Sequence, residues 1–415
     1  MDRITIEEVY LDQNENISYK KDIILRDIDI EKSIKTTQIV VISGVRRSGK
    51  STLLQYLMKK YKDFSYLNFD DERLINFEVT DFQELLLIFK KHSKSKTVFF
   101  DEIQNIPNWE RFIRRIFDEN YKIFITGSNA KLLSSELTTH LTGRYIKIEM
   151  YPFSFPEILR YNNLNTNKLT SNIKAKILTL FDAYLKNGGF PDYIKYQDDE
   201  FLKRIYDDVI YKDLIARFKI RNIKQFKKLS QYLFTNFTSE ISYNSLKNIL
   251  NIKSSNTIQE YISYLEESWL LFELYKYDYS LKKQFISNKK IYCIDNGVRN
   301  IVSFKFSDDN GRLLENMVFL ELKRRQKKLY FFKSKNNREI DFLYTENGMY
   351  HLIQVAYSIN DALTKKRELL AFIDANKELK KTENLLLTYN EEETIQIDQL
   401  TIELKPVWKW LLGII

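Results

Sequence analysis

Apolar positions along this chain of 415 residues follow two different periods, and together they predict a mixed α/β protein. The run QIVVIS and the apolar part of SKTVFFDEIQNI are rich in β-branched and aromatic residues, which predicts buried strands. From Thr52 the spacing becomes helical and places Leu53, Leu54, Leu57 and Met58 on one side. The first third of the chain therefore begins as strand, loop and helix.

The later pattern changes twice. Residues 153–218 have mainly helical spacing, interrupted by the turn in KNGGFPDYIK. Residues 219–300 contain three helical stretches and two apolar β-rich runs, which is the order of a winged helix. After residue 301 a helix leads into alternating strands. We therefore expect four parts, at residues 1–152, 153–218, 219–300 and 301–415.

Composition narrows the chemistry. The 65 Lys and Arg against 56 Asp and Glu give a net charge of +9, which suits a polyanionic partner. A single cysteine excludes an internal disulfide framework, and the three widely spaced histidines exclude a zinc cluster, so a metal ion would need oxygen ligands. The first residues are acidic and polar, and no run approaches the roughly 18 apolar residues of a spanning helix. We expect a cytoplasmic protein without a membrane partner.

The segment GVRRSGKS fits a phosphate loop (Walker A) between a strand and a helix. Two glycines let backbone N–H groups surround a phosphate at a helix N-terminus, where the helix dipole favours an anion. Lys50 would bridge the β- and γ-phosphates of a nucleotide, and Ser51 would bind Mg²⁺. The predicted nucleotide-binding residues are Gly44, Val45, Arg46, Arg47, Ser48, Gly49, Lys50, Ser51 and Thr52.

Two adjacent carboxylates end the next apolar strand. Asp101 would support Mg²⁺ through water, and Glu102 would polarise the attacking water. A further strand, in DFSYLNFDD, lies between the two motifs in the sequence, as in the additional-strand ATPases. Ser128 or Asn129, at the end of the following strand, would position the water or sense the γ-phosphate. Arg144, after Gly143, would reach a nucleotide held by a neighbouring subunit.

These residues resemble the AAA+ superfamily. More narrowly, GVRRSGKSTLL, FFDEIQNIPNWE, ITGSNAKLLSSELTTHLTGR, YPFSFPEIL and GGFPDYI look like the archaeal and bacterial ATPases that carry a C-terminal domain of unknown function. The resemblance runs through nearly the whole chain. It implies an AAA+ core at 1–152 and a helical lid at 153–218. In the lid of related ATPases, a glycine-x-proline lies against the nucleotide base, which implies base contacts from Gly189 and Pro191.

The winged-helix pattern points to DNA. The predicted helix that ends at Glu267 exposes Asn256, Gln259 and Ser263, which would enter a major groove. Lys282, Lys283, Lys289 and Lys290 would lie on a wing against the phosphate backbone. The same helix carries three glutamates and no Lys or Arg from Ser255 onward, which favours a protein partner instead.

The last part resembles a restriction-endonuclease-like α/β core. Glu315 on a helix, Asp341 on a strand and Gln354 on a later strand occupy the metal-binding pattern. Active members carry a lysine two positions after the last acidic or amide residue, whereas this chain has Ala356. The pattern therefore predicts a degenerate nuclease-like domain.

The leading hypothesis is an AAA+ protein that binds ATP and Mg²⁺, hydrolyses ATP and couples this cycle to binding or remodelling duplex or branched DNA as a homo-oligomer. Two alternatives remain open. One is a nucleotide-dependent switch that binds a protein partner without DNA. The other is an ATP-regulated, Mg²⁺-dependent nuclease.

Overall fold

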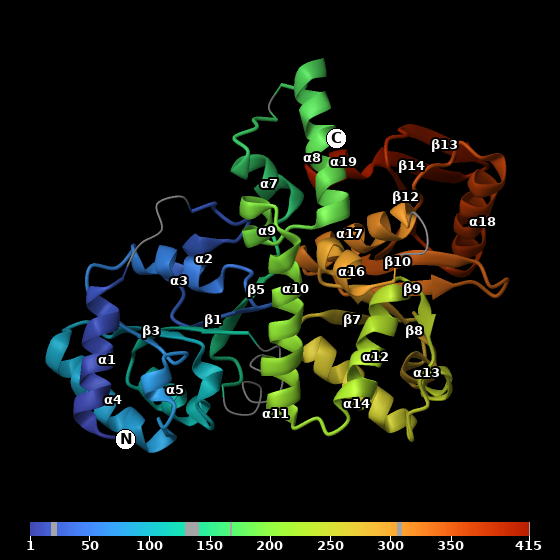
Figure 1. Cartoon of the computed structure of the whole chain (residues 1–415). Coiled ribbons are helices and arrows are strands. Elements are labelled where there is room, and N and C mark those ends of the chain that lie inside the picture. The colour runs from blue at the N-terminus through green and yellow to red at the C-terminus, as the bar shows by residue number, and fades with distance from the viewer. Residues whose placement is uncertain (18–22, 129–140, 167, 305–308, 415) are drawn as a thin grey trace. The chain divides into compact units, whose positions relative to one another are not determined.

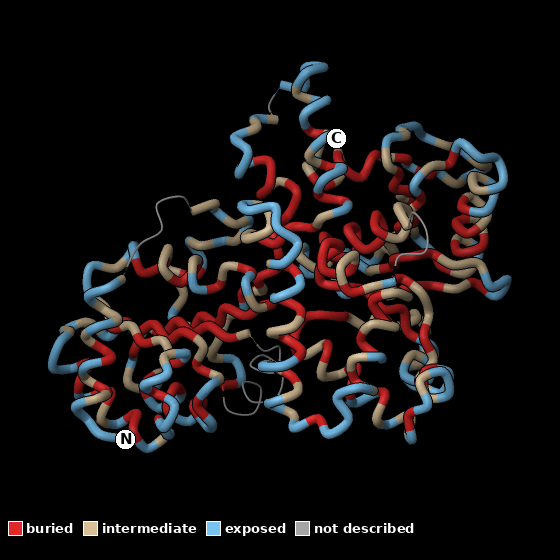
Figure 2. Tube along the Cα trace, in the orientation of Figure 1, coloured by how far each residue is buried: buried red, intermediate tan, exposed pale blue. Residues whose placement is uncertain are grey.

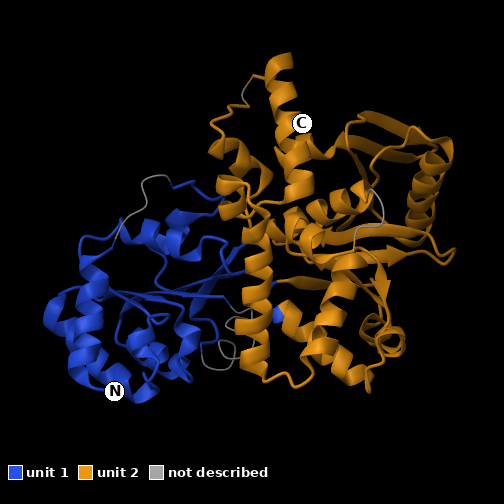
Figure 3. Ribbon diagram, viewed as in Figure 1, with its two compact units in different colours: residues 1–151, 267–269 blue, residues 152–266, 270–415 orange. Residues whose placement is uncertain are grey.

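The computed structural model describes residues 1–17, 23–128, 141–166, 168–304 and 309–414. They form two compact units (Figure 3). Unit 1 comprises residues 1–151 and 267–269, and unit 2 comprises residues 152–266 and 270–415. Each unit contains at least one sheet with helices packed on it, which confirms the predicted mixed α/β class (Figure 1).

Unit 1 is built on a parallel sheet with the strand order β2-β3-β4-β1-β5 among its described residues. The strands are β1 (Ile39–Gly44), β2 (Ser65–Asn68), β3 (Thr97–Asp101), β4 (Lys122–Gly127) and β5 (Tyr145–Met150). Because the strands are parallel, their carboxyl ends meet at one edge of the sheet. The phosphate loop follows β1 at this edge, and the two predicted carboxylates follow β3.

The order of the strands in the sheet differs from their order along the chain. DFSYLNFDD does form a strand, β2, but β2 lies at the edge of the sheet beyond β3. The strand that separates β1 from β3 is β4, which comes later in the chain. Chain order does not determine strand order, because each helical crossover allows the next strand to be placed on either side.

Helices cover both faces of this sheet. Successive side chains of a strand point to opposite faces, so the buried strands are apolar at nearly every position. Val40, Ile42 and Phe124 pack against α3 (Lys50–Met58). Phe100 points to the other face, where its ring contacts Phe89 of α4 (Phe82–His92) and Phe112 of α5 (Trp109–Asp118). The strands β1, β3 and β4 consequently appear as buried segments in Figure 2.

The edge strand β2 is closed by side chains of α1 (Arg3–Glu15). Asn14 exchanges hydrogen bonds with the backbone N–H and C=O of Tyr66, and Gln13 does the same with Asn68. These two amide side chains therefore satisfy backbone groups that would otherwise be open to a further strand. The remaining elements of unit 1 are α2 (Ile30–Lys35), η1 (Glu72–Leu74), η2 (Val79–Asp81) and η3 (Ile103–Asn105).

Unit 2 begins with helices. These are α7 (Phe155–Tyr161), α8 (Ser171–Asn187), α9 (Pro191–Tyr196), α10 (Asp199–Asp208), a π-helical stretch (Val209–Ile215) and α11 (Ala216–Phe218). A three-stranded antiparallel sheet with its helices follows: α12 (Ile223–Thr235), β6 (Glu240–Ile241), α13 (Tyr243–Leu250), α14 (Ser255–Glu267), β7 (Leu271–Tyr275), α15 (Leu281–Ile286) and β8 (Lys289–Cys293). The strand order is β6-β8-β7. This places β8 in the centre, where both of its edges are hydrogen-bonded.

The last part of unit 2 is a mixed sheet with the order β13-β14-β12-β11-β10-β9. Its elements are α16 (Asn296–Val302), α17 (Asn310–Arg324), β9 (Tyr330–Lys333), β10 (Glu339–Glu346), β11 (Met349–Val355), α18 (Ala362–Glu378), β12 (Thr382–Thr388), β13 (Glu393–Ile397), β14 (Leu400–Pro406) and α19 (Val407–Leu411). Leu352, Leu386 and Leu404 of the sheet share a core with Phe372 of α18. None of the described helices has the length and apolarity needed to cross a lipid bilayer.

Candidate functional site

The phosphate loop combines two glycines that are required for different reasons. Gly44 ends β1, and a Cβ atom built there would lie 2.0 Å from the carbonyl oxygen of Met150 in β5. Gly49 has a φ of +97°, in the left-handed region that side chains other than hydrogen disfavour. The first glycine therefore permits close strand packing, and the second turns the chain into α3 with its N–H groups directed outward.

Lys50 is held inside this loop. Its side chain is 4% exposed, and its ammonium donates to the carbonyl oxygens of Gly44 and Val45, each at 3.3 Å. The Nζ atom also lies 3.8 Å from Oε1 of Glu102. Lys50 and Glu102, which the sequence predicts to serve one site, therefore lie close together although they are 52 positions apart.

Asp101 is buried at the end of β3, where it is surrounded by hydroxyl groups. The hydroxyl of Thr126 donates to its Oδ1, and the hydroxyls of Ser51 and Tyr66 also interact with the carboxylate. Burial and the neighbouring Glu102 raise the pKa of Asp101, against the opposing effect of the Thr126 and Ser51 hydroxyls and of Lys50. Ser51 and Asp101, the two predicted magnesium residues, therefore lie together.

Glu102 begins the turn after β3 with a φ of +51°. Its backbone N–H donates to the Thr126 hydroxyl at 3.0 Å, and its carboxylate accepts from Gln104. Burial opposes ionisation, but the Lys50 ammonium and the hydrogen bonds from Gln104 and Ser128 outweigh it and lower the pKa of Glu102. The two adjacent carboxylates thus shift in opposite directions, which keeps Glu102 ionised near neutral pH.

Four contributors to this site were not predicted from the sequence. Thr126 contacts the carboxylate of Asp101 and the backbone N–H of Glu102, Tyr66 interacts with Asp101, and Gln104 bridges Glu102 and Ser128. Arg26 donates to the carbonyl oxygens of Ser48 at 2.8 Å and Tyr151 at 2.6 Å, which braces the loop from outside. Gln104 and Thr126 are close in sequence to the predicted motifs. The residues around Arg26 and Tyr66 give no indication that these two side chains belong to the site.

The residues present suit a nucleotide phosphate and a magnesium ion. The Ser48 hydroxyl is buried inside the loop and has no hydrogen-bond partner among the described residues. A buried hydroxyl of this kind calls for a polar ligand. Ser51 and Asp101 supply the oxygen ligands that Mg²⁺ prefers, and Mg²⁺ commonly keeps several waters and needs few protein ligands.

Comparison with known proteins identifies the relatives of this chain. Residues 36–159 match the model of an AAA domain, and residues 178–309 and 310–410 match two domains of unknown function (DUF8612 and DUF4143). An uncharacterized protein of Methanocaldococcus jannaschii is 42% identical over 431 aligned positions, which cover 99% of this chain and 96% of that protein. The chain belongs to this family of AAA-domain proteins.

A second relative and one solved structure were also compared with this chain. An uncharacterized protein of Haemophilus influenzae is 33% identical over 394 positions, covering 91% of this chain and 95% of that protein. A signal transduction ATPase with numerous domains from Pyrococcus horikoshii is 14% identical, covers 74% of this chain and 46% of that one, and has a TM-score of 0.30. A TM-score this low does not establish a shared fold. The AAA-domain match and the parallel sheet with its phosphate loop make unit 1 an AAA+-type core.

The two other catalytic candidates of the AAA+ core differ in what the structure says of them. Asn129 lies outside the described residues. Arg144 directly precedes β5, and Tyr145 pairs with Ile39 at the start of β1, whereas the phosphate loop follows the end of β1. Arg144 and the phosphate loop therefore lie roughly 16 Å apart along the strand direction, at opposite ends of the parallel strands. Arg144 instead lies 3.5 Å from Asp118.

The predicted base contacts, Gly189 and Pro191, lie in unit 2, where Pro191 begins α9. Both backbone polar groups of Gly189 are engaged: its N–H donates to Asp295 at 2.7 Å, and its carbonyl accepts from Phe153 at 2.7 Å. A Cβ atom at this position would lie 2.3 Å from the Phe153 carbonyl oxygen. Close packing within unit 2 therefore accounts for this glycine, and the base contacts stay a prediction.

The structure divides the DNA-binding candidates. Asn256 and Gln259 are exposed on α14, Ser263 is half-exposed, and Lys282 and Lys283 are exposed on α15. The expectation that Lys289 and Lys290 lie on an exposed wing is wrong, because both are buried in β8, the central strand. Lys289 donates to the carbonyl oxygen of Phe285 at 2.6 Å, and Lys290 faces carboxylates.

The three residues of the nuclease-like pattern do come together. Gln354 accepts from the backbone N–H of Asp341 at 3.0 Å, and Asp341 and Glu315 share the ammonium of Lys290. The amide N–H of Gln354 donates to Glu368 at 2.7 Å. The sequence pattern found Glu315 and Asp341 of this cluster, but it missed Glu339 and Glu368 and placed the lysine on another surface.

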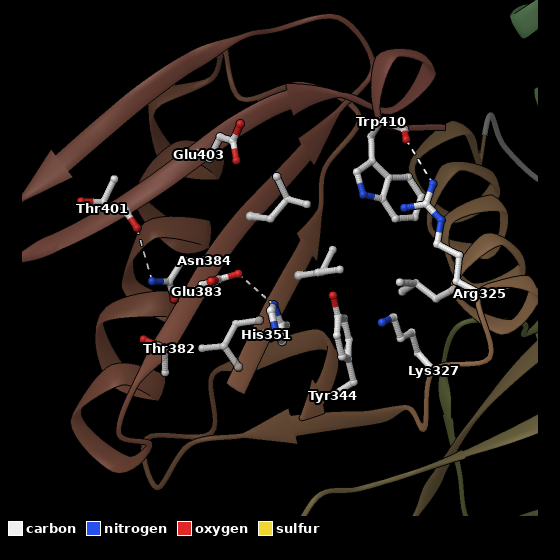
Figure 4. Close-up of a pocket in the computed structure, with 14 residues that line it drawn as sticks. Arg325, Lys327, Tyr344, His351, Thr382, Glu383, Asn384, Thr401, Glu403 and Trp410 are labelled. Atoms are coloured by element: carbon white, nitrogen blue, oxygen red, sulfur yellow. Dashed lines mark hydrogen bonds and ion pairs between the residues drawn. The ribbon is translucent and has the colours of Figure 1, made fainter. Parts of the chain in front are cut away.

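A separate cavity of about 610 Å³ lies on the sheet face that carries Tyr344 and His351, whose rings stack with centroids 4.5 Å apart (Figure 4). Charged groups of its wall are paired locally. His351 contacts Glu383 at 3.0 Å, and Arg325 donates to the carbonyl oxygen of Trp410 at 3.2 Å. The cavity therefore offers aromatic surfaces and paired charges.

Proposed function

We propose that this protein binds and hydrolyses ATP with Mg²⁺ at the carboxyl edge of the parallel sheet in unit 1. The observation that carries the proposal is the convergence of Lys50 with Glu102 and of Ser51 with Asp101. Lys50 and the loop N–H groups would bind the phosphates, and Ser51 and Asp101 would hold Mg²⁺, which supplies charge neutralisation. The ionised Glu102 would orient the attacking water.

Arg144 is assigned to a neighbouring subunit's nucleotide. Its place at the edge opposite the phosphate loop supports this, because it is too distant to serve the nucleotide of its own chain. A guanidinium supplied to a transferring phosphate accelerates hydrolysis by roughly 10³–10⁵-fold. Activity would then require a homo-oligomer.

We expect Mg²⁺-dependent phosphate release per subunit to rise with protein concentration as subunits assemble. Arg144→Ala should lower release by roughly 10³-fold while leaving ATP binding intact. Mixing it with Lys50→Ala protein should restore part of the activity, because one chain then supplies the nucleotide site and the other supplies the arginine. Phosphate release measures the ATPase activity, and light scattering of the same samples measures how many subunits have assembled.

Two results would contradict these assignments separately. Constant activity per subunit in a protein that stays monomeric rejects the role of assembly and of Arg144, but it leaves ATP hydrolysis standing. Absence of Mg²⁺-dependent phosphate release at every concentration rejects the ATPase. Arg3→Ala, which changes a half-exposed arginine of α1, is the matched control and should retain full activity.

We further propose that the nucleotide cycle is coupled to DNA through residues 219–300 acting as a winged helix. The order of α12, α13, α14, β7 and β8 supports this assignment. Asn256 and Gln259 of α14 are exposed and can donate and accept hydrogen bonds at base edges. Lys282 and Lys283 are free to reach the backbone phosphates from the segment between β7 and β8.

A protein partner is the second candidate, and one observation favours it. Leu281, Phe285 and Ile286 of α15 are 65–73% exposed beside these lysines. Exposed apolar side chains gathered in one short segment are typical of protein docking surfaces. Glu260, also exposed on α14, would repel DNA phosphates.

Binding to fluorescent duplex, single-stranded and branched DNA across a salt series separates the two candidates. DNA coupling predicts saturable binding that weakens with salt, and Lys282→Ala with Lys283→Ala should reduce the salt slope by about 2. Lys335→Ala, an exposed lysine of the C-terminal part, is the control. Absence of saturable binding at low salt would reject the DNA proposal and favour the protein partner.

A further inference from the structure

A buried lysine lies at the centre of the nuclease-like acidic cluster. The ammonium of Lys290, in β8, contacts Glu315 of α17 at 2.9 Å, Glu339 of β10 at 2.7 Å and Asp341 of β10 at 3.0 Å. The side chain of Lys290 is only 4% exposed. An ammonium has three N–H donors, and here each donor has a carboxylate within hydrogen-bond distance.

The strand geometry aims this lysine at the cluster. Residues two apart on a strand point to the same face, and Tyr292 accordingly donates to the same Glu315 oxygen at 2.7 Å. Lys289 directly precedes Lys290, points to the opposite face and donates to the carbonyl oxygen of Phe285 instead. The contact is therefore fixed by the pairing of β8 within its sheet and does not depend on a flexible lysine stem.

Other oxygens and an amide of the cluster are also engaged. Oδ2 of Asp341 accepts from the backbone N–H of Val355 at 3.0 Å, and Lys333 contacts Glu339 at 3.6 Å. Gln354 is bonded to the backbone N–H of Asp341 and to Glu368. A divalent ion in this place would require oxygens at about 2.0–2.6 Å from one centre, which the ammonium and these bonds prevent.

Charge reinforces the arrangement. Burial disfavours the ammonium, but Glu315, Tyr292, Asp341 and Glu339 outweigh it and raise the pKa of Lys290 well above its ordinary value. Burial and repulsion from Glu315 raise the pKa of Asp341, and the Lys290 ammonium opposes this rise. Removing the lysine would leave buried carboxylates without compensation.

We propose that the Lys290 ammonium is the permanent cation of the Glu315, Glu339 and Asp341 cluster, so that the C-terminal core holds no divalent metal ion and cuts no nucleic acid. The lysine that the nuclease pattern lacks after Gln354 is replaced by one from a different sheet, and it occupies the place of the metal. The cluster fastens β8 to α17 and β10, which joins the middle and C-terminal parts of unit 2.

Metal binding tests the proposal on the intact protein. Mn²⁺ titration of the nucleotide-free full chain, followed by electron paramagnetic resonance, should give the same binding curve for the wild type and for Asp341→Asn. Supercoiled DNA should remain uncut with Mg²⁺ or Mn²⁺. A Mn²⁺ site that is lost in Asp341→Asn, or cutting abolished by Asp341→Ala, would overturn the proposal.

Stability tests the ion pairs themselves. Lys290→Met should lower Tm by roughly 5–10 °C, because it leaves buried carboxylates unpaired. The triple variant Lys290→Met, Glu339→Gln, Asp341→Asn removes charge from both sides and should recover most of the loss. Lys282→Met, at an exposed lysine, should leave Tm unchanged.

The triple variant keeps this test decisive if Lys290→Met does not fold, because the soluble yields of the two variants can then be compared. An unchanged Tm in Lys290→Met would show that the ammonium does not hold the cluster. A triple variant no more stable or soluble than the single one would show that charge balance is not what the lysine supplies. Either result would refute the proposal.

Discussion

Glu102→Gln should bind ATP as tightly as the wild type and yet hydrolyse it roughly 10²–10⁴-fold more slowly. The substitution preserves the size of the side chain and a hydrogen-bonding oxygen facing Gln104, so the loop and Lys50 stay in place. It removes the negative charge that would orient and polarise the attacking water. Fluorescent-nucleotide binding and phosphate release measure the two effects independently.

The contrast between binding and turnover makes this prediction specific. Glu31→Gln is the matched control, because Glu31 is 70% exposed on α2 in the same unit and should leave both quantities unchanged. Full turnover by Glu102→Gln would refute its role in orienting water. Loss of ATP binding would show instead that its contact with Lys50 organises the phosphate site.

Lys50→Ala should weaken ATP binding by roughly 10²-fold or more, since two charge-assisted hydrogen bonds to phosphate are worth about 3 kcal/mol together. The variant also removes the ammonium that lies 3.8 Å from the ionised Glu102, so the site would repel phosphate more strongly. Hydrolysis falls in consequence. The affinity is measured by calorimetry with a non-hydrolysable ATP analogue.

Lys35→Ala provides the control for this change, because Lys35 is 77% exposed at the end of α2. Its affinity for the analogue should equal that of the wild type. Lys50→Ala protein that binds with wild-type affinity would show that the phosphates lie elsewhere. A normal thermal transition in Lys50→Ala would separate a binding defect from unfolding.

The nucleotide site was the part of the structure most open to prediction. Lys50 and Ser51 follow a glycine-rich loop, and Asp101 and Glu102 follow an apolar strand, so local spacing revealed both motifs. Their proximity required only that both strands be parallel members of one sheet. The supporting Arg26 and Tyr66 could not be predicted, because each acts across tertiary contacts that have no signature in the neighbouring residues.

Two lysines illustrate the limit in unit 2. Lys289 and Lys290 stand in a basic-looking run, NKKIYC, which suggested a solvent-facing wing. The structure instead places them in the central strand β8, where adjacent residues point to opposite faces. Whether a strand is central or exposed depends on its partners in the sheet, and these are remote in sequence.

The sequence alone determined the mixed α/β class, the phosphate loop and the pair of carboxylates after β3, because these depend on local periodicity and on short motifs. Only the tertiary structure placed β4 between β1 and β3, set Arg144 at the opposite edge from the phosphate loop, and brought Lys290 to Glu315 and Asp341. These contacts join segments 25 and 51 positions apart, and burial makes their charges interdependent. Such pairings follow from how whole sheets and helices pack, which no local pattern records.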